Sequence, residues 1–386
     1  MAATNASEKL EKLIKIAENG ESYSPTCNMD HLKRKKLKPE VLKKLTDAAE
    51  GGNAEAQFEL GDRYLRELGV EGNRQLAENY LKMAADQNHA KALYGLYVIN
   101  SQKSPPVRYA YDEFFGTQIA IADESADPSF IEPSKLLLKS AELGCPKAQE
   151  MIGSDYLYMT VCHGEDGSEV VLKSVENGDC DVEEIEKGWE WKLKAANNGS
   201  DNAQLELAER YEVGIHLPQP DMEKAIRWYK KAARKSPVAQ YRLGVIYDEG
   251  KVVKKDKSMA AKYFTKAAKS NFCGPEAQYR LGLLYANGEG LERDMTKAVT
   301  LFLESVLSGY YAPAKYELGH CYYKGIGVKL DDAKAMKWWL EAAKQGYSQA
   351  IKVVLNSYAI GDLGEKDEAK AAYWQRAIPS WSDTVI

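Results

Sequence analysis

The stretch "AQYRLGVIYDEG" at residues 239–250 returns 38 residues later as "AQYRLGLLYANG" at residues 277–288. Near identity over twelve residues at such a spacing indicates an internal repeat, and the fold therefore depends on the period. Aligning the rest of the chain on the alanine that opens this stretch gives eight copies, which begin at Ala56, Ala90, Ala148, Ala203, Ala239, Ala277, Ala314 and Ala350.

The residue types within each copy predict an amphipathic helix, which we name helix A. In the sixth copy Leu281, Gly282 and Tyr285 follow the opening alanine by four, five and eight places, and most other copies have similar residues there. Spacings of four and eight place residues on one helical face. A glycine within a helix costs about 0.5–1 kcal/mol relative to alanine. The recurring small residue therefore predicts that another helix packs closely against this position.

A second helical pattern, helix B, follows about twenty residues later. It reads "AIRWYKKAA" at 225–233 and "AMKWWLEAA" at 335–343, with alanines at the first and eighth places. A residue suited to capping a helix N-terminus precedes the opening alanine by four places at Asn73, Asp221, Asp256, Asp294 and Asp331. The repeating unit is therefore predicted to be an αα-hairpin of about 36–38 residues with a glycine-containing turn.

The combined pattern, A-x-x-x-L-G-x-x-Y, G-x-G-V, D, A-x-x-W/Y and A-A-x-x-G, resembles that of the Sel-1-like repeat family, which is related to tetratricopeptide repeats. The match is strongest from Gln204 to about Tyr358 and is good around 54–92. The resemblance implies an all-α fold, a right-handed α-α superhelix (solenoid) of about eight helix pairs, whose A helices line an inner groove.

Two regions depart from the simple repeat. Residues 1–38 read as a polar and basic leader, which includes "HLKRKKLK" at 31–38, and residues 39–386 read as a single solenoid. The second and third copies each carry about twenty additional residues between helix A and helix B, at about 101–130 and 159–184. Loops of this kind emerge from the same edge of a solenoid, so these two neighbours are expected to meet.

The two insertions allow two interpretations. They are either turns that pack on one another or a contact for a specific partner, because binding residues favour loops held on rigid scaffolds. The first insertion is aromatic and the second is acidic. For the second interpretation the candidate residues are Tyr109, Tyr111, Phe114, Phe115, Glu165 and Asp166.

Helix A also predicts a binding surface on the groove. By analogy with tetratricopeptide repeats, the residues two, three, six and nine places after the opening alanine line it. The candidates are Tyr241, Arg242, Tyr279, Arg280, Tyr316, His320 and Tyr323, with Glu317 beside them. Tyrosine and arginine are enriched at interaction hot spots. The alternative is that these tyrosines pack against one another between repeats and bind nothing.

The sequence offers little that resembles a catalytic or metal site. Cys162 and His163 are adjacent, whereas zinc ligands come in two spaced pairs, and no oxyanion-binding group accompanies them. The chain lacks a GxxxxGK[ST] phosphate loop. We therefore expect no enzymatic activity, no metal and no cofactor. A hydrolase that uses Cys162 and His163 is the less favoured alternative.

Composition limits the class of partner. The formal net charge is −5, which argues against a nucleic-acid partner because nucleic-acid-binding domains are usually strongly basic. The sequence has no apolar run of the ~18–20 residues that a membrane span needs and no secretory signal pattern. We expect a cytoplasmic, non-catalytic scaffold or adaptor that binds another protein. The alternatives are a bacterial immunity protein that neutralises a cognate, basic toxin and a bacterial factor that engages a host protein.

Overall fold

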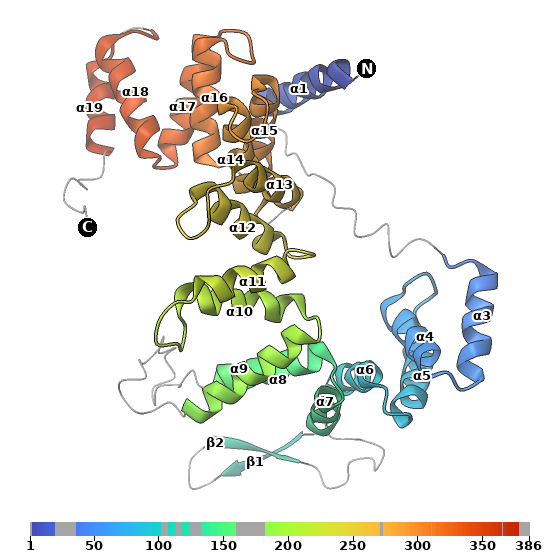
Figure 1. Ribbon diagram of the computed structural model, residues 1–386. Coiled ribbons are helices and arrows are strands. Elements are labelled where there is room, and N and C mark those ends of the chain that lie inside the picture. The colour runs from blue at the N-terminus through green and yellow to red at the C-terminus, as the bar shows by residue number, and fades with distance from the viewer. Residues whose placement is uncertain are drawn as a thin grey trace. The chain divides into compact units, whose positions relative to one another are not determined.

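The computed structural model describes residues 2–19, 36–101, 107–112, 117–122, 133–159, 182–270, 273–309, 311–364 and 366–377. The chain divides into two compact units. The first, which we call the N-terminal unit, comprises Asn28–Lys231. The second, the C-terminal unit, joins Met1–Cys27 to Ala232–Ile386. Each unit is a row of helical hairpins (Figure 1).

In the N-terminal unit a single helix precedes the hairpins, and a short β-hairpin lies between two of the later helices. The elements are α3 (Pro39–Glu50), α4 (Ala54–Arg66), α5 (Arg74–Asp86), α6 (Ala90–Ser101), β1 (Val107–Asp112), β2 (Thr117–Ala122), α7 (Pro133–Glu142), α8 (Pro146–Met159), α9 (Val182–Asn197), α10 (Asp201–Val213) and α11 (Met222–Ala232). Even-numbered helices from α4 to α10 are the predicted A helices, and α5, α7, α9 and α11 are the B helices. Helix α3 is the single helix that precedes the first hairpin.

The C-terminal unit continues the alternation of A and B helices. Its elements are α1 (Ala2–Asn19), α12 (Pro237–Glu249), α13 (Lys257–Ala267), α14 (Gly274–Asn287), α15 (Met295–Gly309), α16 (Ala312–Lys324), α17 (Asp332–Lys344), α18 (Ser348–Ile360) and α19 (Glu368–Ala377). Helices α12, α14, α16 and α18 are A helices. The predicted α-solenoid class is confirmed, since consecutive helices pack on one another from α3 to α10 and from α12 to α19. Among the described residues, no helix combines the length and apolar character needed to cross a bilayer.

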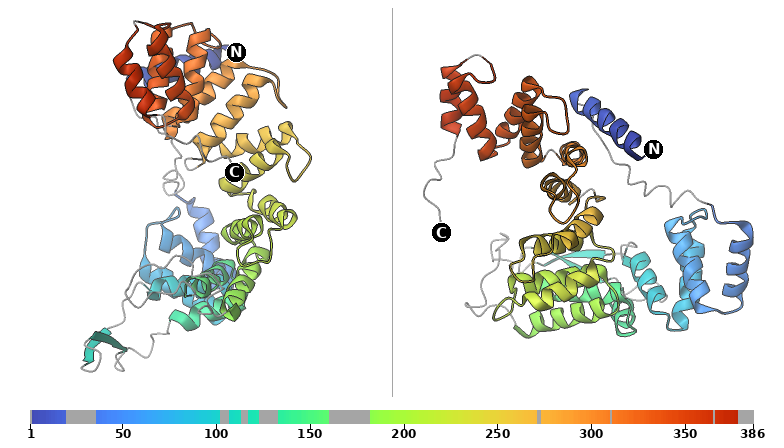
Figure 2. Two further views of the ribbon diagram at one scale, coloured as in Figure 1. Left: turned by 90° about the vertical axis from the view of Figure 1, so that its left-hand side faces the viewer. Right: turned by 45° about the horizontal axis from the view of Figure 1, so that its top comes forward.

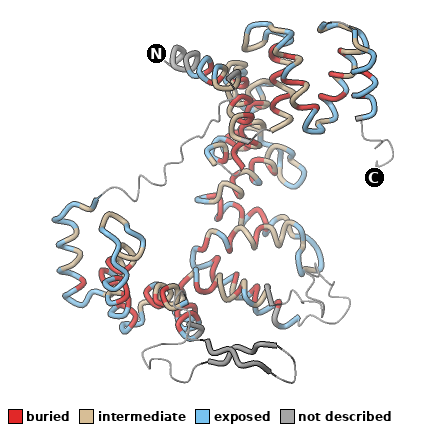
Figure 3. The backbone as a smooth tube through the Cα atoms, turned by 180° about the vertical axis from the view of Figure 1, so that it is seen from behind, coloured by how far each residue is buried: buried red, intermediate tan, exposed pale blue. Residues whose placement is uncertain are grey.

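In four hairpins the glycine of helix A makes room for a large residue of helix B. A Cβ atom added to Gly282 would lie 2.5 Å from Cε1 of Phe302, and one added to Gly61 would lie 2.7 Å from Cγ of Leu81. Gly319 contacts Trp339 in the same way. The close packing inferred from the recurring glycine is therefore confirmed. The buried residues lie along the helix surfaces that face one another in each hairpin (Figure 3).

The turn is closed by the predicted capping residue in the five hairpins for which a cap was predicted. The Asp294 carboxylate accepts a hydrogen bond from the Lys297 amide at 2.9 Å, and the Asp294 amide donates to the carbonyl of Tyr285. The Lys297 ammonium lies 5.3 Å from the centre of the Tyr285 ring. All of the predicted caps accept a bond of this kind, at Asn73, Asp221, Asp256, Asp294 and Asp331. The recurring tyrosine of helix A thus contacts the turn through its carbonyl and its ring, in addition to packing between the helices.

The contact between successive hairpins uses a residue that the sequence interpretation did not consider. The glutamine directly after the opening alanine donates its side-chain amide to the carbonyl of an alanine near the end of the preceding B helix. Gln57 donates to Ala49 at 2.9 Å, and Gln204 donates to Ala196 at 2.9 Å. This bond satisfies an exposed carbonyl at a helix C-terminus and fixes one hairpin against the next.

The predicted register of the second copy is wrong by two residues. His89 Nδ1 accepts a hydrogen bond from the Ala92 amide at 3.3 Å, as Asn53 does from the Ala56 amide. Ala92 is fully buried and is therefore the equivalent of Ala56, in place of Ala90. Gly95 had fitted the small-residue position by residue type alone, whereas the capping bond sets the true register.

Two elements were not expected from the repeat pattern. Strands β1 and β2 pair antiparallel within the first insertion, with Tyr109 opposite Ala120 and Tyr111 opposite Gln118. Helix α1 occupies part of the region that we expected to be a polar leader, and it packs on α15 (Figures 1 and 2).

The contact of α1 with α15 is both apolar and ionic. Leu10 and Leu13 of α1 are buried in the core of the C-terminal unit, and Lys9 Nζ lies 2.5 Å from a carboxylate oxygen of Glu304. The basic segment 31–35 lies outside the described residues.

Candidate partner-binding surface

The A helices of the C-terminal unit carry a row of tyrosines, which we call the tyrosine face: Tyr241, Tyr279, Tyr311, Tyr316 and Tyr347. A tyrosine two places after the opening alanine packs on the residue that precedes the next A helix. The Tyr279 and Tyr311 ring centroids are 5.3 Å apart, and those of Tyr316 and Tyr347 are 5.4 Å apart. Tyr241 packs on Phe264 of α13 at 5.9 Å. Tyr279 and Tyr316 are thus each joined to the next repeat, whereas the ring contact of Tyr241 lies within its own hairpin.

These rings are only partly buried. Burial raises the pKa of Tyr279, and it does the same to a smaller extent for Tyr311, Tyr316 and Tyr347. All five members of the tyrosine face keep a part of their surface accessible to solvent. The alternative in which the tyrosines pack between repeats is therefore correct as a description of their contacts, and it leaves ring surface available to a ligand.

The two predicted arginines behave differently. Arg280 forms an ion pair with Asp248 of α12, with 3.5 Å between Nη1 and Oδ2. Asp248 also accepts from Lys257 at 2.7 Å, and Lys257 pairs with Glu289 at 2.7 Å. Arg280 therefore belongs to a charge network that links α12, α13 and α14. Arg242 is exposed.

The remaining predicted residues of the surface lie at its C-terminal part. His320 lies 4.6 Å from the Tyr316 ring and 5.1 Å from the Trp339 ring. Burial and the nearby Lys324 lower the pKa of His320, so its imidazole is neutral at pH 7. Tyr323 packs on Trp339 at 5.6 Å and is 40% exposed.

Two carboxylates accompany the tyrosines. Burial raises the pKa of Glu317, and Glu317 in turn raises the pKa of Tyr279, Tyr316 and Tyr347, because its negative charge opposes a phenolate. Glu276 has the same effect on Tyr311. Oε2 of Glu276 is buried and has no hydrogen-bond partner within the described part of the chain. The surface therefore combines aromatic rings with two carboxylates, and the charge of Arg280 also acts on Tyr279 and Tyr311, whose pKa values it lowers.

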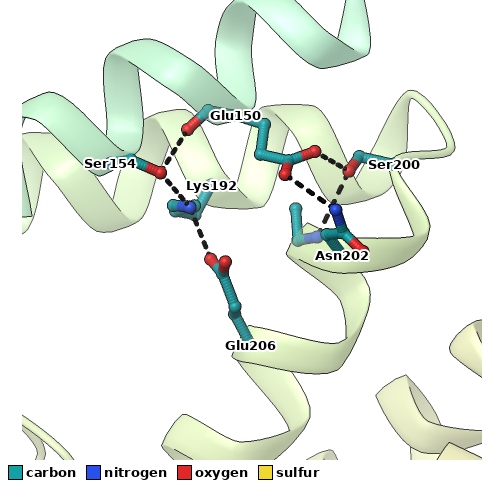
Figure 4. Close-up of polar contacts among 7 residues, drawn as sticks. Glu150, Ser154, Lys192, Ser200, Asn202 and Glu206 are labelled. Atoms are coloured by element: carbon teal, nitrogen blue, oxygen red, sulfur yellow. Dashed lines mark hydrogen bonds and ion pairs between the residues drawn. The ribbon is translucent and has the colours of Figure 1, made fainter. Parts of the chain in front are cut away.

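The corresponding helix face in the N-terminal unit carries hydrogen bonds in place of rings. Glu150 of α8 stands two places after its opening alanine, and its carboxylate accepts from Ser200 Oγ at 2.5 Å and from Asn202 Nδ2 at 3.2 Å. Ser200 precedes α10 directly, as Tyr311 precedes α16. Figure 4 shows these contacts.

A buried lysine lies at the centre of the same polar cluster. Lys192 of α9 is 2% exposed, donates to Ser154 Oγ at 2.6 Å and pairs with Glu206 at 2.5 Å (Figure 4). In other hairpins a large apolar or aromatic residue takes this position opposite the small residue of helix A: Leu81, Tyr229, Phe264, Phe302 and Trp339. Lys192 therefore replaces an apolar contact with a polar cluster that joins α8, α9 and α10.

The predicted candidates in the two insertions cannot be placed as side chains. Tyr109 and Tyr111 lie on β1, and nothing is described of their side chains. The remaining insertion residues and the Cys–His pair lie outside the described residues: Phe114, Phe115, Cys162, His163, Glu165 and Asp166. Within the described ranges no group of three His, Cys, Asp or Glu side chains is suitable for a metal ion.

Two members of the tyrosine face, Tyr311 and Tyr347, were missed by the sequence analysis. Each stands three places before the opening alanine of its copy, in "YAPA" and "YSQA". A tyrosine at the same position in two consecutive copies is the sequence pattern that could have identified both residues.

Comparison with known proteins identifies the repeat. The Sel1 repeat model matches residues 54–89, 175–200, 201–236, 237–272, 275–310 and 312–347, which together make up more than half of the chain. The chain belongs to the Sel1 repeat family. The suspected resemblance is therefore confirmed, and the second copy, whose register was misplaced, is among the parts that the model does not match. Proteins of this family are typically protein-interaction scaffolds.

Two solved Sel1 repeat structures are similar to this chain. A protective antigen of uropathogenic Escherichia coli with an SLR fold is 25% identical and has a TM-score of 0.58, covering 89% of this chain and 64% of that one. A Sel1 repeat protein from Oxalobacter formigenes is 27% identical, with a TM-score of 0.48, covering 65% of this chain and 95% of that one.

Two curated proteins are also similar in sequence. An uncharacterized protein of Neisseria meningitidis serogroup B is 26% identical over 234 residues, 60% of this chain and 40% of that protein. The chitin synthase regulator of Saccharomyces cerevisiae is 25% identical over 231 residues, 57% of this chain and 33% of the regulator. The Sel1 repeat chain thus spans between a third and two fifths of the length of these relatives.

Proposed function

We propose that this Sel1 repeat chain is a non-catalytic scaffold that binds a partner protein through the tyrosine face of its C-terminal unit. The observation that carries the proposal is the set of partly exposed tyrosines on α12, α14 and α16 and directly before α16 and α18, with ring contacts joining α14 to the start of α16 and α16 to the start of α18.

Packing between the rings favours binding. A tyrosine that is held on one side by a neighbouring ring has little rotamer freedom left to lose when a partner covers its other side. Tyr279 is fixed by Tyr311 and Phe302, and Tyr316 is fixed by Tyr347 and His320. Such rings offer a large contact area at low entropic cost, which is a property of interaction hot spots.

A photo-crosslinking experiment tests this proposal without disturbing the core. The crosslinking amino acid p-benzoylphenylalanine replaces Arg242 or Tyr323, which are exposed residues of the predicted binding surface. The matched control is the same replacement at Tyr373 of α19, a B-helix residue that is 65% exposed. We expect Arg242 and Tyr323 to capture the same protein and Tyr373 not to capture it. Equal capture from all three positions would remove the tyrosine face as the binding site.

The absence of catalysis is part of the proposal. Among the described thiols, burial raises the pKa of Cys321 to about 12 and also raises that of Cys273, so neither is a thiolate at neutral pH. The hydrolase alternative depends on Cys162, and Cys162→Ser separates the two: a hydrolase loses activity, whereas a scaffold retains its partner.

The specific biological role of the scaffold stays a prediction. A cytoplasmic adaptor, an immunity protein that neutralises a basic toxin and a factor that engages a host protein all use the same kind of surface. Each would be distinguished by the identity of the protein captured from Arg242 and Tyr323.

A further inference from the structure

The environment of Glu317 on α16 is unusual for a carboxylate. It lies among Tyr279, Tyr316 and Tyr347, each of which senses its charge, and burial raises its own pKa. Glu317 is half-buried, and a carboxylate that is partly withdrawn from water is stabilised by an ion-pair or hydrogen-bond partner that offsets the loss of hydration. Within the described part of the chain, no hydrogen bond or ion pair to Glu317 is found, and its oxygens are not sealed from solvent.

Glu276 on α14 provides a second and independent observation. Its Oε2 atom is buried without a hydrogen-bond partner among the described residues, and its charge acts on Tyr311, which packs on Tyr279. Two carboxylates therefore lie beside the ring pairs Tyr279–Tyr311 and Tyr316–Tyr347. Oε2 of Glu276 is buried and contributes its charge alone, whereas Glu317 leaves acceptor capacity that a donor from another molecule can satisfy.

The cations nearest to these carboxylates do not meet this need. Arg280 is paired with Asp248 at 3.5 Å within the network that includes Lys257. Lys324 lowers the pKa of both Glu317 and His320 through its charge, but no ion pair joins it to Glu317 in the described part of the chain. A cationic hydrogen-bond donor for the Glu317 carboxylate would therefore come from another molecule.

We propose that the tyrosine face takes an arginine or lysine side chain of the partner protein, with Glu317 as its carboxylate acceptor and Tyr279, Tyr316 and Tyr347 as the surrounding rings. This inference rests on the proposed function and specifies the chemistry of the partner. Charge complementarity selects the occupant: a cation is attracted by the faces of aromatic rings and by a carboxylate, whereas an acidic segment is repelled by both.

The partner segment is therefore basic at one anchoring position. Arginine is the favoured anchor, because its planar guanidinium stacks on a tyrosine ring while donating to a carboxylate. The carboxylate of Glu276 beside Tyr311 extends the preference for basic residues along the same surface.

Selection from a peptide library tests the inference, because it does not require the partner to be identified first. Random twelve-residue peptides displayed on phage are selected on the full chain, and the dissociation constants of the enriched peptides are measured by calorimetry. We expect arginine or lysine at a fixed position of the enriched sequences. Glu317→Gln and Glu317→Lys should each weaken binding by roughly tenfold or more, since a charge-assisted pair is lost. Glu292→Gln, at an exposed glutamate before α15, is the matched control and should leave binding unchanged.

A double-mutant cycle then assigns the contact. Replacing the basic residue of the peptide by norleucine should cause the same loss as Glu317→Gln, and the two changes together should cause little more. Peptides that depend on Tyr279 but lack a basic residue would overturn this inference and leave the proposed function intact. Peptides that are insensitive to both Tyr279→Ala and Glu317→Gln, or a selection that yields no binder, would retire the proposed function as well.

Discussion

The ring of Tyr279 on α14 lies 5.3 Å from the ring of Tyr311, the residue that directly precedes α16. The carboxylate of Glu150 on α8 has the same relationship to Ser200, which directly precedes α10. The residue two places after the opening alanine therefore contacts the residue that starts the next A helix, whatever their chemistry. The same geometry yields an aromatic surface in one unit and a hydrogen-bonded surface in the other.

Tyr279→Ala is predicted to destabilise the protein, because it removes ring contacts with both Tyr311 and Phe302. The expected loss is about 2 kcal/mol or more, at the lower end for a large core residue since the ring is only partly buried. Urea unfolding followed by circular dichroism measures it. Tyr311→Ser, which introduces the residue type found before α10, should cost less than Tyr279→Ala. An equal or larger cost for Tyr311→Ser would show that the pair does not behave as described.

Gly282→Ala is predicted to destabilise the chain even though alanine favours helix by about 1 kcal/mol relative to glycine. The added Cβ would lie 2.5 Å from Cε1 of Phe302, and both residues are in the packed interior. Thermal unfolding should show a lower midpoint for Gly282→Ala. Phe302→Leu, which in the parent chain reproduces the Gly61–Leu81 pair of the first hairpin, should cost less in the Gly282→Ala background than in the parent chain, because leucine lacks the ring atoms nearest to the added Cβ. Independent effects would rule out the steric explanation.

Much of the fold could be predicted because helix pairs repeat their residue types at fixed spacing. Small residues, caps and aromatics recur where packing and hydrogen bonding require them, and Asp294 illustrates how a cap is readable from its position alone. The register of the second copy was not readable in this way. It depends on the bond from the Ala92 amide to His89, a residue type that is not usual at helix caps.

The candidate surface was predictable only in part. Tyr279 and Tyr316 follow from the helical pattern, since their positions in helix A repeat. The carboxylates without a partner do not follow from the pattern, because the sequence does not show that Arg280 pairs with Asp248. The docking of α1 on α15 was missed for a related reason: an amphipathic helix outside the repeat period gives no indication of which helix it will cover.

Lys192→Leu is predicted to be neutral or stabilising. Leucine is the residue that faces Gly61 in the first hairpin, and a buried ion pair often contributes less than an apolar contact of similar volume. Glu206→Ala should instead destabilise by about 1–3 kcal/mol, because it leaves a buried ammonium with only Ser154 as a partner. Urea denaturation of both variants makes the comparison. Strong destabilisation by Lys192→Leu would indicate that the polar cluster is essential to the packing.

Leu13→Asp is predicted to release α1 from the C-terminal unit. Leu13 is 2% exposed in the core that α15 helps to form, and burying a carboxylate there is unfavourable. Hydrogen exchange should accelerate in α1, with smaller changes in α15. Lys12→Asp, at an exposed position on the same helix, is the control and should leave exchange in α15 unchanged. Unchanged protection in Leu13→Asp would show that the α1–α15 contact does not persist in solution.

Glu317→Gln is predicted to stabilise the protein at neutral pH while weakening the proposed binding of a basic side chain. Burial raises the folded-state pKa of Glu317 above its unfolded value, so the folded state binds this proton more tightly than the unfolded state. The contribution of Glu317 to stability is therefore most favourable below the usual glutamate pKa of about 4.5, and it is lost as the pH rises through the raised folded-state value.

The difference in unfolding free energy between Glu317→Gln and the parent chain should therefore depend on pH. Glutamine carries no charge, so the stability gain of Glu317→Gln over the parent chain should be largest at pH 7 and should disappear as the pH falls below about 4.5. Urea unfolding across this range measures the gain, with Glu292→Gln as the exposed control that should show no such dependence. A gain that is absent at pH 7, or that grows as the pH falls, would mean that Glu317 already has a partner within the chain.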